Sequence, residues 1–315
     1  MVRPVNVLLH YNAGPRLRDV LDEESTDGVR VTWTPEGDDD AWFRAMATAE
    51  TLLHVLEPVT AEAMDAAPNL QLIQKLGVGV NTIDLDAARA RGIAVANLPG
   101  SNAIAVAEHT LGLLLAVLRR VPAFDREVRA GTGWPLAAEI PDGLGEVAGR
   151  VVGLVGYGAI AQRFGSYVAA MGATVVHHRR SEGPDSVSLD ELLAVADVVS
   201  VHLPLTDETR NLLDARRLGV MRPGAVLLNT GRGGVVDEQA LADLLRSGHL
   251  AGAGIDVFEQ EPIDIPTNPL VGLDNVVLSP HVAWLTADTL ARSIRLGVAN
   301  ARLVARGQEP EHRVA

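Results

Sequence analysis

Three side chains suited to proton and charge chemistry stand in short segments, each of which follows an apolar, strand-like run. The side chains are Arg232, Glu261 and His281, in segments 229–234, 256–262 and 279–284. The carboxyl ends of parallel strands meet at the ligand crevice of an α/β sheet. We therefore expect these three side chains to share one crevice.

Their chemistry suits the reduction of a ketone that lies next to a carboxylate. The guanidinium of Arg232 can bind the carboxylate of a 2-oxo acid and polarise its ketone, and His281 can give a proton to the alkoxide that forms as hydride arrives. A carboxylate beside the imidazole, such as Glu261, stabilises the protonated ring. Each side chain alone also has a structural interpretation, as a turn cation, a helix-start charge or a loop histidine. Together with the glycine motif described next, they favour catalysis.

A glycine-rich turn follows the strand-like run 151–155 directly and precedes a helical stretch. Its sequence, G-Y-G-A-I-A at 156–161, matches the dinucleotide fingerprint in the context that this fingerprint requires. Gly156 permits the tight turn and Gly158 lets a pyrophosphate approach the backbone. The free N–H groups near Ala159 and Ile160, aided by the helix dipole, favour its negative charge. The alternative is an ordinary turn that needs glycine only for its geometry.

The end of the next strand bears on which nicotinamide cofactor is preferred. An acidic residue about 20 positions after the glycines holds the ribose diol of NAD, but this chain has Arg179, Arg180 and Ser181 there. Two guanidiniums and a hydroxyl can bind the 2′-phosphate of NADP, which we therefore expect as the cofactor. Alternatively the arginines are a solvated strand end and NAD is accepted. Glu182 and Asp185 are close enough to hold a diol instead.

Short β-branched runs alternate with helical stretches along the chain, a pattern typical of parallel sheets covered by helices. The pattern predicts strands at 5–9, 29–33, 51–55, 70–75 and 93–96, with helices at 41–49, 60–67 and 84–91. It predicts a second set of strands at 151–155, 174–178, 198–202, 225–229, 253–257 and 275–278, then a helix at 287–306. The expected class is α/β, with two doubly wound parallel sheets.

Composition narrows the classes of protein to which the chain can belong. Its 315 residues suit two domains, and 47% hydrophobic residues exclude a disordered or fibrous chain. With 27 basic and 40 acidic residues the formal charge is −13, which disfavours nucleic acid and anionic membranes as partners. The absence of cysteine excludes disulfides, thiolate metal sites and a cysteine nucleophile, and fits the cytoplasm.

The apolar segments predict neither export nor membrane insertion. The N-terminal apolar run is short and lacks a cleavage site, so we expect no signal peptide. The longest apolar stretch, 103–118, is interrupted by Glu108 and His109 and is shorter than the roughly 20 residues of a membrane span. We expect a helix buried between domains or subunits. The nine histidines are scattered along the chain, so no metal site is expected.

Several stretches, taken in order, resemble the D-isomer-specific 2-hydroxyacid dehydrogenases along nearly the whole chain. They are LGVGVNTID at 76–84, AVAEH at 105–109, the glycine fingerprint, HLPLT at 202–206, the 229–234 segment, DVFE with Glu261-Pro262, and Pro280-His281. Their order and spacing are far more specific than the glycine motif alone. The resemblance implies an NAD(P)-dependent oxidoreductase that acts on small 2-hydroxy or 2-oxo acids.

The resemblance also implies roles for individual residues. Arg232, Glu261 and His281 would be the catalytic triad, and the backbone at Val78 and Gly79 would bind the substrate carboxylate. Asp256 would lie near the nicotinamide carboxamide. Further cofactor contacts would come from Leu203, Pro204, Thr209, Thr230, Gly231 and Ala283.

Departures from the family pattern indicate a branch. Ala161 replaces the commoner third glycine, a change that the fingerprint tolerates. The Arg-Arg-Ser run from Arg179 and the residues Ala283-Trp284 look like those of glyoxylate and hydroxypyruvate reductases. Formate dehydrogenases of the same family have Gln where this chain has Glu261, which argues against formate.

The family arrangement inserts a dinucleotide-binding Rossmann domain, residues 100–285, into a flavodoxin-like substrate-binding domain, residues 1–99 and 286–315. The two crossings would lie near 98–101 and 284–286. The apolar helix at 103–118 fits the family's homodimer contact, or else is buried within the monomer.

These features make an NADP-preferring reductase of glyoxylate or hydroxypyruvate the leading hypothesis. The alternatives are an NADH-dependent dehydrogenase of a bulkier acid such as D-lactate, and a cofactor-sensing binding protein, since the fold also occurs in transcriptional corepressors. The sequence does not determine the substrate side chain, because loops contact the substrate. The physiological direction depends on metabolite concentrations.

Overall fold

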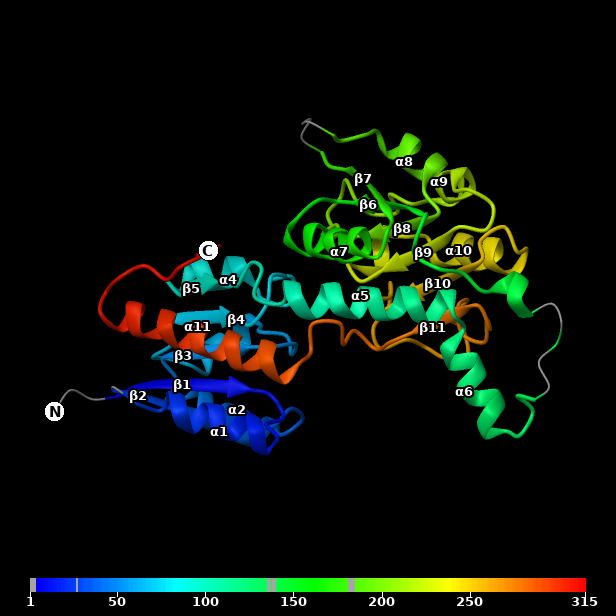
Figure 1. Ribbon diagram of the computed structural model, residues 1–315. Coiled ribbons are helices and arrows are strands. Elements are labelled where there is room, and N and C mark those ends of the chain that lie inside the picture. The colour runs from blue at the N-terminus through cyan, green and yellow to red at the C-terminus, as the bar shows by residue number, and fades with distance from the viewer. Residues whose placement is uncertain (1–3, 27, 135–136, 138–139, 181–184) are drawn as a thin grey trace. The chain divides into compact units, whose positions relative to one another are not determined.

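The computed structural model describes residues 4–26, 28–134, 137, 140–180 and 185–315. The chain forms two compact units. Unit 1 comprises Met1–Asn102 and Leu285–Ala315, and unit 2 is the segment Ala103–Trp284 between them (Figure 1). The sequence placed these boundaries after residues 99 and 285. The functional names given to the two domains remain predictions.

Within its described residues, unit 1 has a parallel sheet of five strands in the order β2-β1-β3-β4-β5. The strands are β1 (Val5–His10), β2 (Val29–Thr34), β3 (Thr51–His54), β4 (Leu72–Lys75) and β5 (Ala94–Ala96). This order is the flavodoxin-like one, with the topological switch between β1 and β3. Every residue of β3 and β4 is buried, because helices cover both faces of the sheet.

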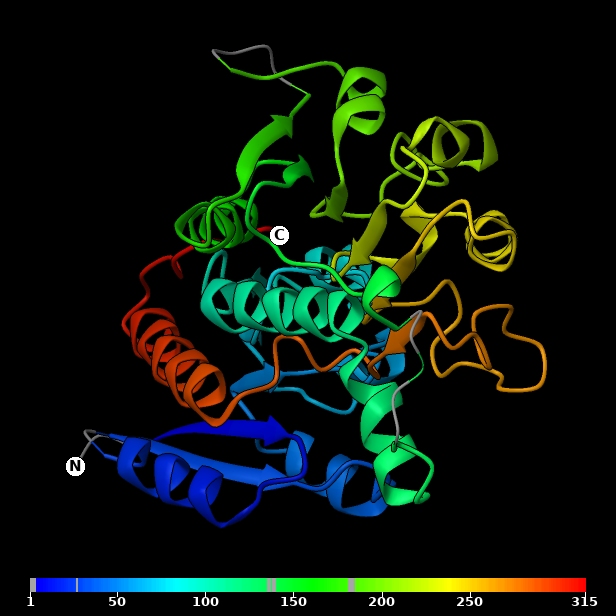
Figure 2. The same ribbon diagram turned by 45° about the vertical axis from the view of Figure 1, so that its right-hand side comes forward.

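Two groups of helices cover this sheet. Alternate strand residues such as Leu8, Leu52 and Ile73 pack against one group, which comprises α2 (Asp39–Met46), α3 (Ala61–Asp65) and α4 (Leu85–Ala90). Asp38, Thr60 and Asp84 cap these helices with side-chain oxygens. The other group is α1 (Pro15–Glu24) and α11 (Ala287–Ala305), which pack together (Figures 1 and 2). The side chain of Asn300 on α11 donates to Gln74 of β4 at 2.7 Å.

The described part of unit 2 has six parallel strands in the order β11-β10-β9-β8-β6-β7. They are β6 (Val151–Val155), β7 (Thr174–His178), β8 (Val198–Val201), β9 (Val226–Asn229), β10 (Gly252–Ile255) and β11 (Val276–Leu278). An isolated parallel bridge joins His177 to Ser186 at the edge of β7 away from β6. With that bridge the order near the glycine turn is the Rossmann order, with its switch point between β6 and β8.

The helices of unit 2 lie along both faces of its sheet. They are α5 (Ala103–Leu118), α6 (Val121–Arg129), α7 (Ala159–Ala170), α8 (Leu189–Val195), α9 (Ala215–Val220) and α10 (Glu238–Arg246). One core cluster joins α5 and α7 to the sheet through residues such as Leu114, Leu154 and Phe164. The other includes residues of α8, α9 and α10. The two doubly wound sheets confirm the expected fold class.

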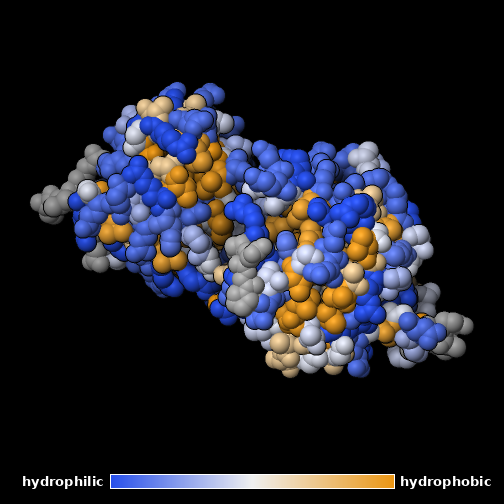
Figure 3. Space-filling view, turned by 90° about the horizontal axis from the view of Figure 1, so that it is seen from above, coloured by the Kyte–Doolittle hydropathy of each residue, from blue (hydrophilic) through white to orange (hydrophobic). Residues whose placement is uncertain are grey.

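Most predicted elements are present with small differences in their ends. The strands at 151–155 and 174–178 have the predicted bounds, whereas β8 ends at Val201 and leaves His202 in the following loop. The sequence interpretation placed no helix at α1. Within the described residues, no helix is long and apolar enough to cross a membrane. Seen from above, the surface is mainly hydrophilic with groups of hydrophobic residues, as is normal for folded proteins (Figure 3).

Candidate active site

The glycine turn links β6 to α7 and brings the backbone close to a neighbouring loop. Gly156 has φ 93°, and a Cβ atom there would lie 2.7 Å from the carbonyl oxygen of His202, so only glycine fits. Gly158 is the N-cap of α7, and no side chain of the described residues caps this helix. The first N–H groups of α7, at Ala159 and Ile160, therefore have no side-chain acceptor among the described residues. This arrangement fits the pyrophosphate of a dinucleotide.

The end of β7 carries the two arginines beside this turn. Arg179 is half-buried, and its Nε atom is buried without a hydrogen-bond partner among the described residues. Its backbone N–H donates to Ser186 Oγ at 3.3 Å, and Arg180 is exposed. The two guanidiniums place positive charge at the end of β7, which suits an anionic ligand. Ser181 and Glu182 lie outside the described residues.

Arg232 lies in the turn after β9, and hydrogen bonds made by Asn229 at the end of that strand stabilise the turn. Asn229 is buried, accepts a hydrogen bond from the N–H of Gly231 at 3.1 Å and donates to the carbonyl of Arg232 at 3.0 Å. The guanidinium of Arg232 donates to the carbonyl of Gly231 at 2.8 Å. A Cβ atom at Gly233 would lie 1.8 Å from the carbonyl carbon of Phe258, so this turn packs directly on the segment that carries Glu261.

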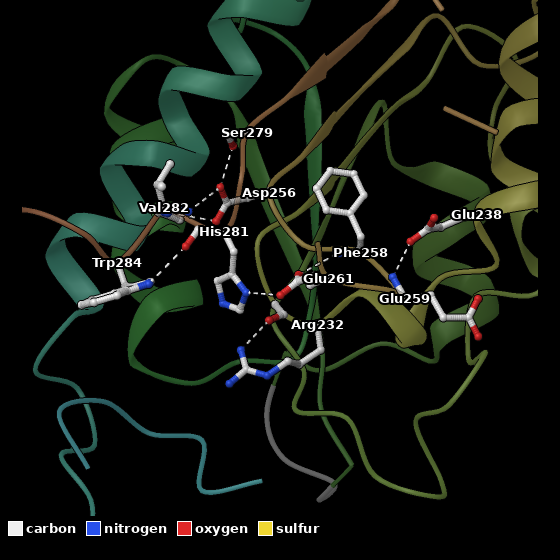
Figure 4. Close-up of polar contacts among 12 residues, drawn as sticks. Arg232, Glu238, Asp256, Phe258, Glu259, Glu261, Ser279, His281, Val282 and Trp284 are labelled. Atoms are coloured by element: carbon white, nitrogen blue, oxygen red, sulfur yellow. Dashed lines mark hydrogen bonds and ion pairs between the residues drawn. The ribbon is translucent and has the colours of Figure 1, made fainter. Parts of the chain in front are cut away.

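Glu261 and His281 form a short hydrogen bond, with Glu261 Oε2 2.6 Å from His281 Nδ1. The carboxylate can only accept, so Nδ1 carries the proton and Nε2 is left to face a ligand. Glu261 also accepts from the N–H of Phe258 at 2.9 Å. Figure 4 shows the guanidinium of Arg232 beside this pair. The structure thus brings the three predicted catalytic side chains together.

The surroundings shift the pKa values of two charged groups in this cluster, Glu261 and Arg232. Burial alone would raise the pKa of Glu261, but hydrogen bonds from His281 and the Phe258 N–H, together with nearby positive charge, lower it below its ordinary value. Burial lowers the pKa of Arg232, and the negative charge of Glu261 opposes that effect. Arginine nevertheless stays protonated in proteins. The site therefore holds a carboxylate and a guanidinium in their charged forms.

The loop that carries His281 is held by Asp256, which follows β10. Asp256 is fully buried and accepts from Ser279 Oγ at 2.6 Å and from the N–H groups of Val282 and Ala283 at 3.0 and 2.9 Å (Figure 4). Its carbonyl accepts from the His281 N–H at 2.8 Å. His281 itself has φ 54°, the left-handed region that non-glycine residues rarely adopt. Surrounding contacts must hold such a conformation.

Sequence reasoning missed the structural roles of Asn229 and Ser279 and gave Asp256 a cofactor role alone. The signal available in the sequence was where these residues stand, because Asn229 ends a buried strand and Asp256 follows one. A polar residue there needs a buried partner. In this structure the Asp256 carboxylate accepts hydrogen bonds from the His281 loop, and His109 Nε2 lies 3.5 Å from it.

Other residues that were predicted to contact the cofactor lie in the loops that follow β8 and β9. Thr209 donates to the carbonyl of Pro204 at 2.6 Å, which closes the loop that begins with Leu203. Thr230 is buried and its hydroxyl lies 2.9 Å from that of Thr110. No group of His, Cys, Asp and Glu side chains among the described residues is arranged to hold a metal ion.

Val78 and Gly79 belong to unit 1, in the loop after β4. Val78 is 46% exposed, and its carbonyl accepts from the side chain of Asn97 at 2.9 Å. Within the described residues, the N–H groups of Val78 and Gly79 form no hydrogen bond. Free backbone donors in an exposed loop suit a carboxylate.

Comparisons with known proteins identify the family. Residues 111–283 match the sequence model of the family described as D-isomer specific 2-hydroxyacid dehydrogenase, NAD binding domain. D-3-phosphoglycerate dehydrogenase from Mycobacterium tuberculosis is 41% identical over 289 residues, which cover 87% of this chain and 54% of that protein. Glyoxylate reductase from Thermofilum pendens is 39% identical over 306 residues, or 93% of this chain and 87% of that protein. The chain thus spans about half the length of the phosphoglycerate dehydrogenases that it matches.

Solved structures share the fold over the whole chain. The TT0316 protein of Thermus thermophilus has a TM-score of 0.87 at 39% identity, and the alignment covers 99% of this chain and 100% of that one. The apo form of D-mandelate dehydrogenase from Rhodotorula graminis has a TM-score of 0.83 at 27% identity, with 99% and 98% covered. The family resemblance predicted from the sequence is confirmed: the chain belongs to the D-isomer specific 2-hydroxyacid dehydrogenase family.

Proposed function

We propose that this protein is an NADP-preferring dehydrogenase that reduces a small 2-oxo acid such as glyoxylate or hydroxypyruvate. The observation that carries the proposal is the Glu261–His281 pair at 2.6 Å with the Arg232 guanidinium beside it. A positive charge, a proton donor and a carboxylate that holds the donor are the groups that ketone reduction by hydride requires. The family includes members with this type of activity, and glyoxylate reductases are among the relatives.

A bound nicotinamide would supply the hydride, and the residues of the chain would handle charge and proton. Arg232 would bind the carboxylate and polarise the ketone oxygen of the substrate, and its partly buried position strengthens both contacts. His281 would give the proton on Nε2 to the oxygen as the alkoxide forms. Glu261 would hold the ring by Nδ1 and stabilise its positive charge until that transfer. The N–H groups of Val78 and Gly79 are proposed to bind the substrate carboxylate.

The cofactor would be held by the glycine turn and the end of β7. The uncapped start of α7 fits a pyrophosphate, and the guanidiniums of Arg179 and Arg180 fit the 2′-phosphate that distinguishes NADP from NAD. Leu203, Pro204, Thr209, Thr230, Gly231, Asp256 and Ala283 remain the proposed contacts to the rest of the cofactor. A homodimer through α5 is proposed as well, since its partly exposed side chains Ile104, Leu111 and Leu115 are apolar.

The function is tested by steady-state turnover of a panel of 2-oxo acids with NADPH. The panel includes glyoxylate, hydroxypyruvate, pyruvate, a branched 2-oxo acid and phosphohydroxypyruvate. The last of these is the oxidised partner of the substrate named for the phosphoglycerate dehydrogenases. We expect the highest kcat/KM with glyoxylate or hydroxypyruvate. His281→Ala should turn over its substrate about 10²- to 10⁴-fold more slowly than wild type, because it lacks the general acid.

Other outcomes favour other functions. Wild-type turnover that survives in His281→Ala would show that the assigned acid is wrong. Cofactor binding without turnover of any acid in the panel would favour the binding-protein alternative. Preference for a bulky acid with NADH would favour the second dehydrogenase hypothesis.

Cofactor preference is tested by kcat/KM for NADPH and for NADH in the wild type and in the double variant Arg179→Gln/Arg180→Gln. Because charge-assisted contacts to a phosphate contribute roughly 1.5–3 kcal/mol, we expect the variant to lose about 10- to 100-fold with NADPH and little with NADH. Arg163→Gln, an exposed arginine on the neighbouring helix α7, is the matched control. An NADH preference in the wild type would remove the role given to Arg179 and Arg180.

A further inference from the structure

Two neighbouring polar side chains of helix α5 reach the two loops that carry the catalytic side chains. His109 Nε2 lies 2.9 Å from Ser279 Oγ, and Thr110 Oγ1 lies 2.9 Å from Thr230 Oγ1. Ser279 is two residues before His281, and Thr230 is two residues before Arg232. One turn of α5 therefore contacts both loops, in each loop at the residue two positions before the reactive side chain.

The direction of the hydrogen bonds can be assigned around Ser279. A carboxylate can only accept, so the single hydroxyl proton of Ser279 goes to Asp256 at 2.6 Å. The oxygen of Ser279 is then left to accept, and the N–H at Nε2 of His109 donates to it. The hydrogen-bond chain thus runs from His109 to Ser279 to Asp256, and His109 Nε2 also lies 3.5 Å from Asp256 Oδ1.

Asp256 connects this hydrogen-bond chain to the His281 loop. Its side chain is 1% exposed, so protein donors take the place of water around its charge. Two of these donors are the N–H groups of Val282 and Ala283, which directly follow His281. The left-handed backbone at His281 depends on such contacts, because an isolated chain disfavours it. Rotation of the Ser279 hydroxyl away from Asp256 would remove one of the contacts that fix this loop.

We propose that His109 is a positioning residue for proton transfer, which acts through Ser279 and Asp256 to keep the His281 imidazole against Glu261. This inference rests on the proposed function, because it assigns His109 to the same site. His109 itself is 28% exposed at its side chain and lies outside the pair that it would orient. A purely structural role would affect thermal stability without a selective effect on kcat.

The test compares two substitutions at His109 with a control on the same helix. His109→Gln keeps an N–H donor at a similar reach, whereas His109→Met keeps the volume and removes the donor. Glu108→Gln changes an exposed neighbour and is the control. Each variant is assayed for kcat and KM with glyoxylate, for the Kd of NADPH, and for the primary isotope effect with NADPH deuterated at the transferred position.

We expect His109→Met to lower kcat about tenfold, the effect of roughly one hydrogen bond. The Kd of NADPH should stay within twofold of wild type, and the isotope effect should rise because hydride transfer with its coupled proton transfer becomes slower. His109→Gln should recover most of kcat, and Glu108→Gln should match wild type. In the Ser279→Ala background, His109→Met should cause a smaller loss than in the wild type, because only the direct 3.5 Å contact of His109 Nε2 with Asp256 Oδ1 then remains to be removed.

Equal losses in His109→Gln and His109→Met, a wild-type kcat in His109→Met, or additive losses with Ser279→Ala would each overturn the inference. A readout that needs no turnover separates it from the proposed function. The indole N–H of Trp284 donates to the His281 carbonyl at 3.1 Å, so its NMR resonance reports the loop. That resonance should shift in His109→Met and return in His109→Gln, even if the wild type reduces no 2-oxo acid. An unshifted resonance would contradict the link to His281.

Discussion

At the scale of single residues, Glu261 is a charged group held where burial opposes its charge. The hydrogen bonds from His281 and the Phe258 N–H, with the positive charge of Arg232, offset that burial. The negative charge thus depends on the other members of the site, and they depend on it in turn. This mutual dependence explains why the three side chains have their chemistry only as a group.

Replacing Glu261 by Gln tests whether its charge or only its hydrogen bond is needed. Glu261→Gln keeps an acceptor for His281 Nδ1 but no longer stabilises the positive ring. We expect kcat for 2-oxo acid reduction to fall about 10- to 100-fold, within the range of general acid catalysis. The alkaline limb of kcat against pH should also move to lower pH. Steady-state assays from pH 5 to 9 measure both effects.

Glu259→Gln is the matched control for this change. Glu259 lies in the same segment and is exposed, so its substitution removes the same charge without touching His281. Its profile should overlay that of the wild type. A pH profile of Glu261→Gln that coincides with wild type would contradict the role assigned to the carboxylate.

At the scale of elements, the site depends on two turns that pack backbone against backbone. The turn after β9 carries Arg232 and the segment after β10 carries Glu261, and Gly233 is where they meet. A Cβ atom at Gly233 would lie 1.8 Å from the carbonyl carbon of Phe258 and 2.0 Å from its oxygen. Backbone atoms cannot move aside as a flexible side chain can, so a larger residue must separate the two segments.

We therefore expect Gly233→Ala to lower the free energy of unfolding by about 3 kcal/mol or more, as overpacking does. It should also abolish turnover, because Arg232 and Glu261 move apart. Gly219→Ala is the control, since Gly219 is in helix α9 with no atom within 4 Å of the new Cβ. That variant should be more stable than wild type by about 0.5–1 kcal/mol. Urea unfolding measures the stability of both variants, and a steady-state assay measures the turnover of Gly233→Ala. A stable, active Gly233→Ala protein would refute the packing argument.

The same elements show what the sequence can predict and what it cannot. The bounds of β6 and β7 were predicted because glycines and β-branched residues mark them locally. Helix α1 was missed because Leu17, Val20 and Leu21 are its few buried residues among charged ones. The residue types and positions of Arg232, Glu261 and His281 were predicted, and the structure brings them together. The role of Asp256 in holding the 279–283 loop was not, because it depends on a contact between distant segments.

At the scale of the whole molecule, unit 1 contains a histidine that the fold keeps neutral. His54 is 2% exposed, and its Nε2–H donates to the carbonyl of Glu57 at 2.6 Å. Its Nδ1 is buried with no hydrogen-bond partner among the described residues. Protonation would bury an N–H without an acceptor beside the positive charge of Lys75. Burial first, and then Lys75, lower the pKa of His54 to about 3.

This shift predicts that acid destabilises unit 1. Between about pH 6.5 and pH 3 the unfolded chain binds a proton at His54 and the folded chain does not, so the free energy of unfolding falls as pH falls. From pH 7 to pH 5 the loss from this group reaches about 2 kcal/mol.

His54→Gln keeps the donor to Glu57 without a titrating ring, and should flatten the pH dependence by that amount. His312→Gln, an exposed histidine of the same unit, should leave the slope unchanged. Urea unfolding at half-unit steps of pH measures the slopes, and parallel curves for wild type and His54→Gln would show that His54 is not the group responsible.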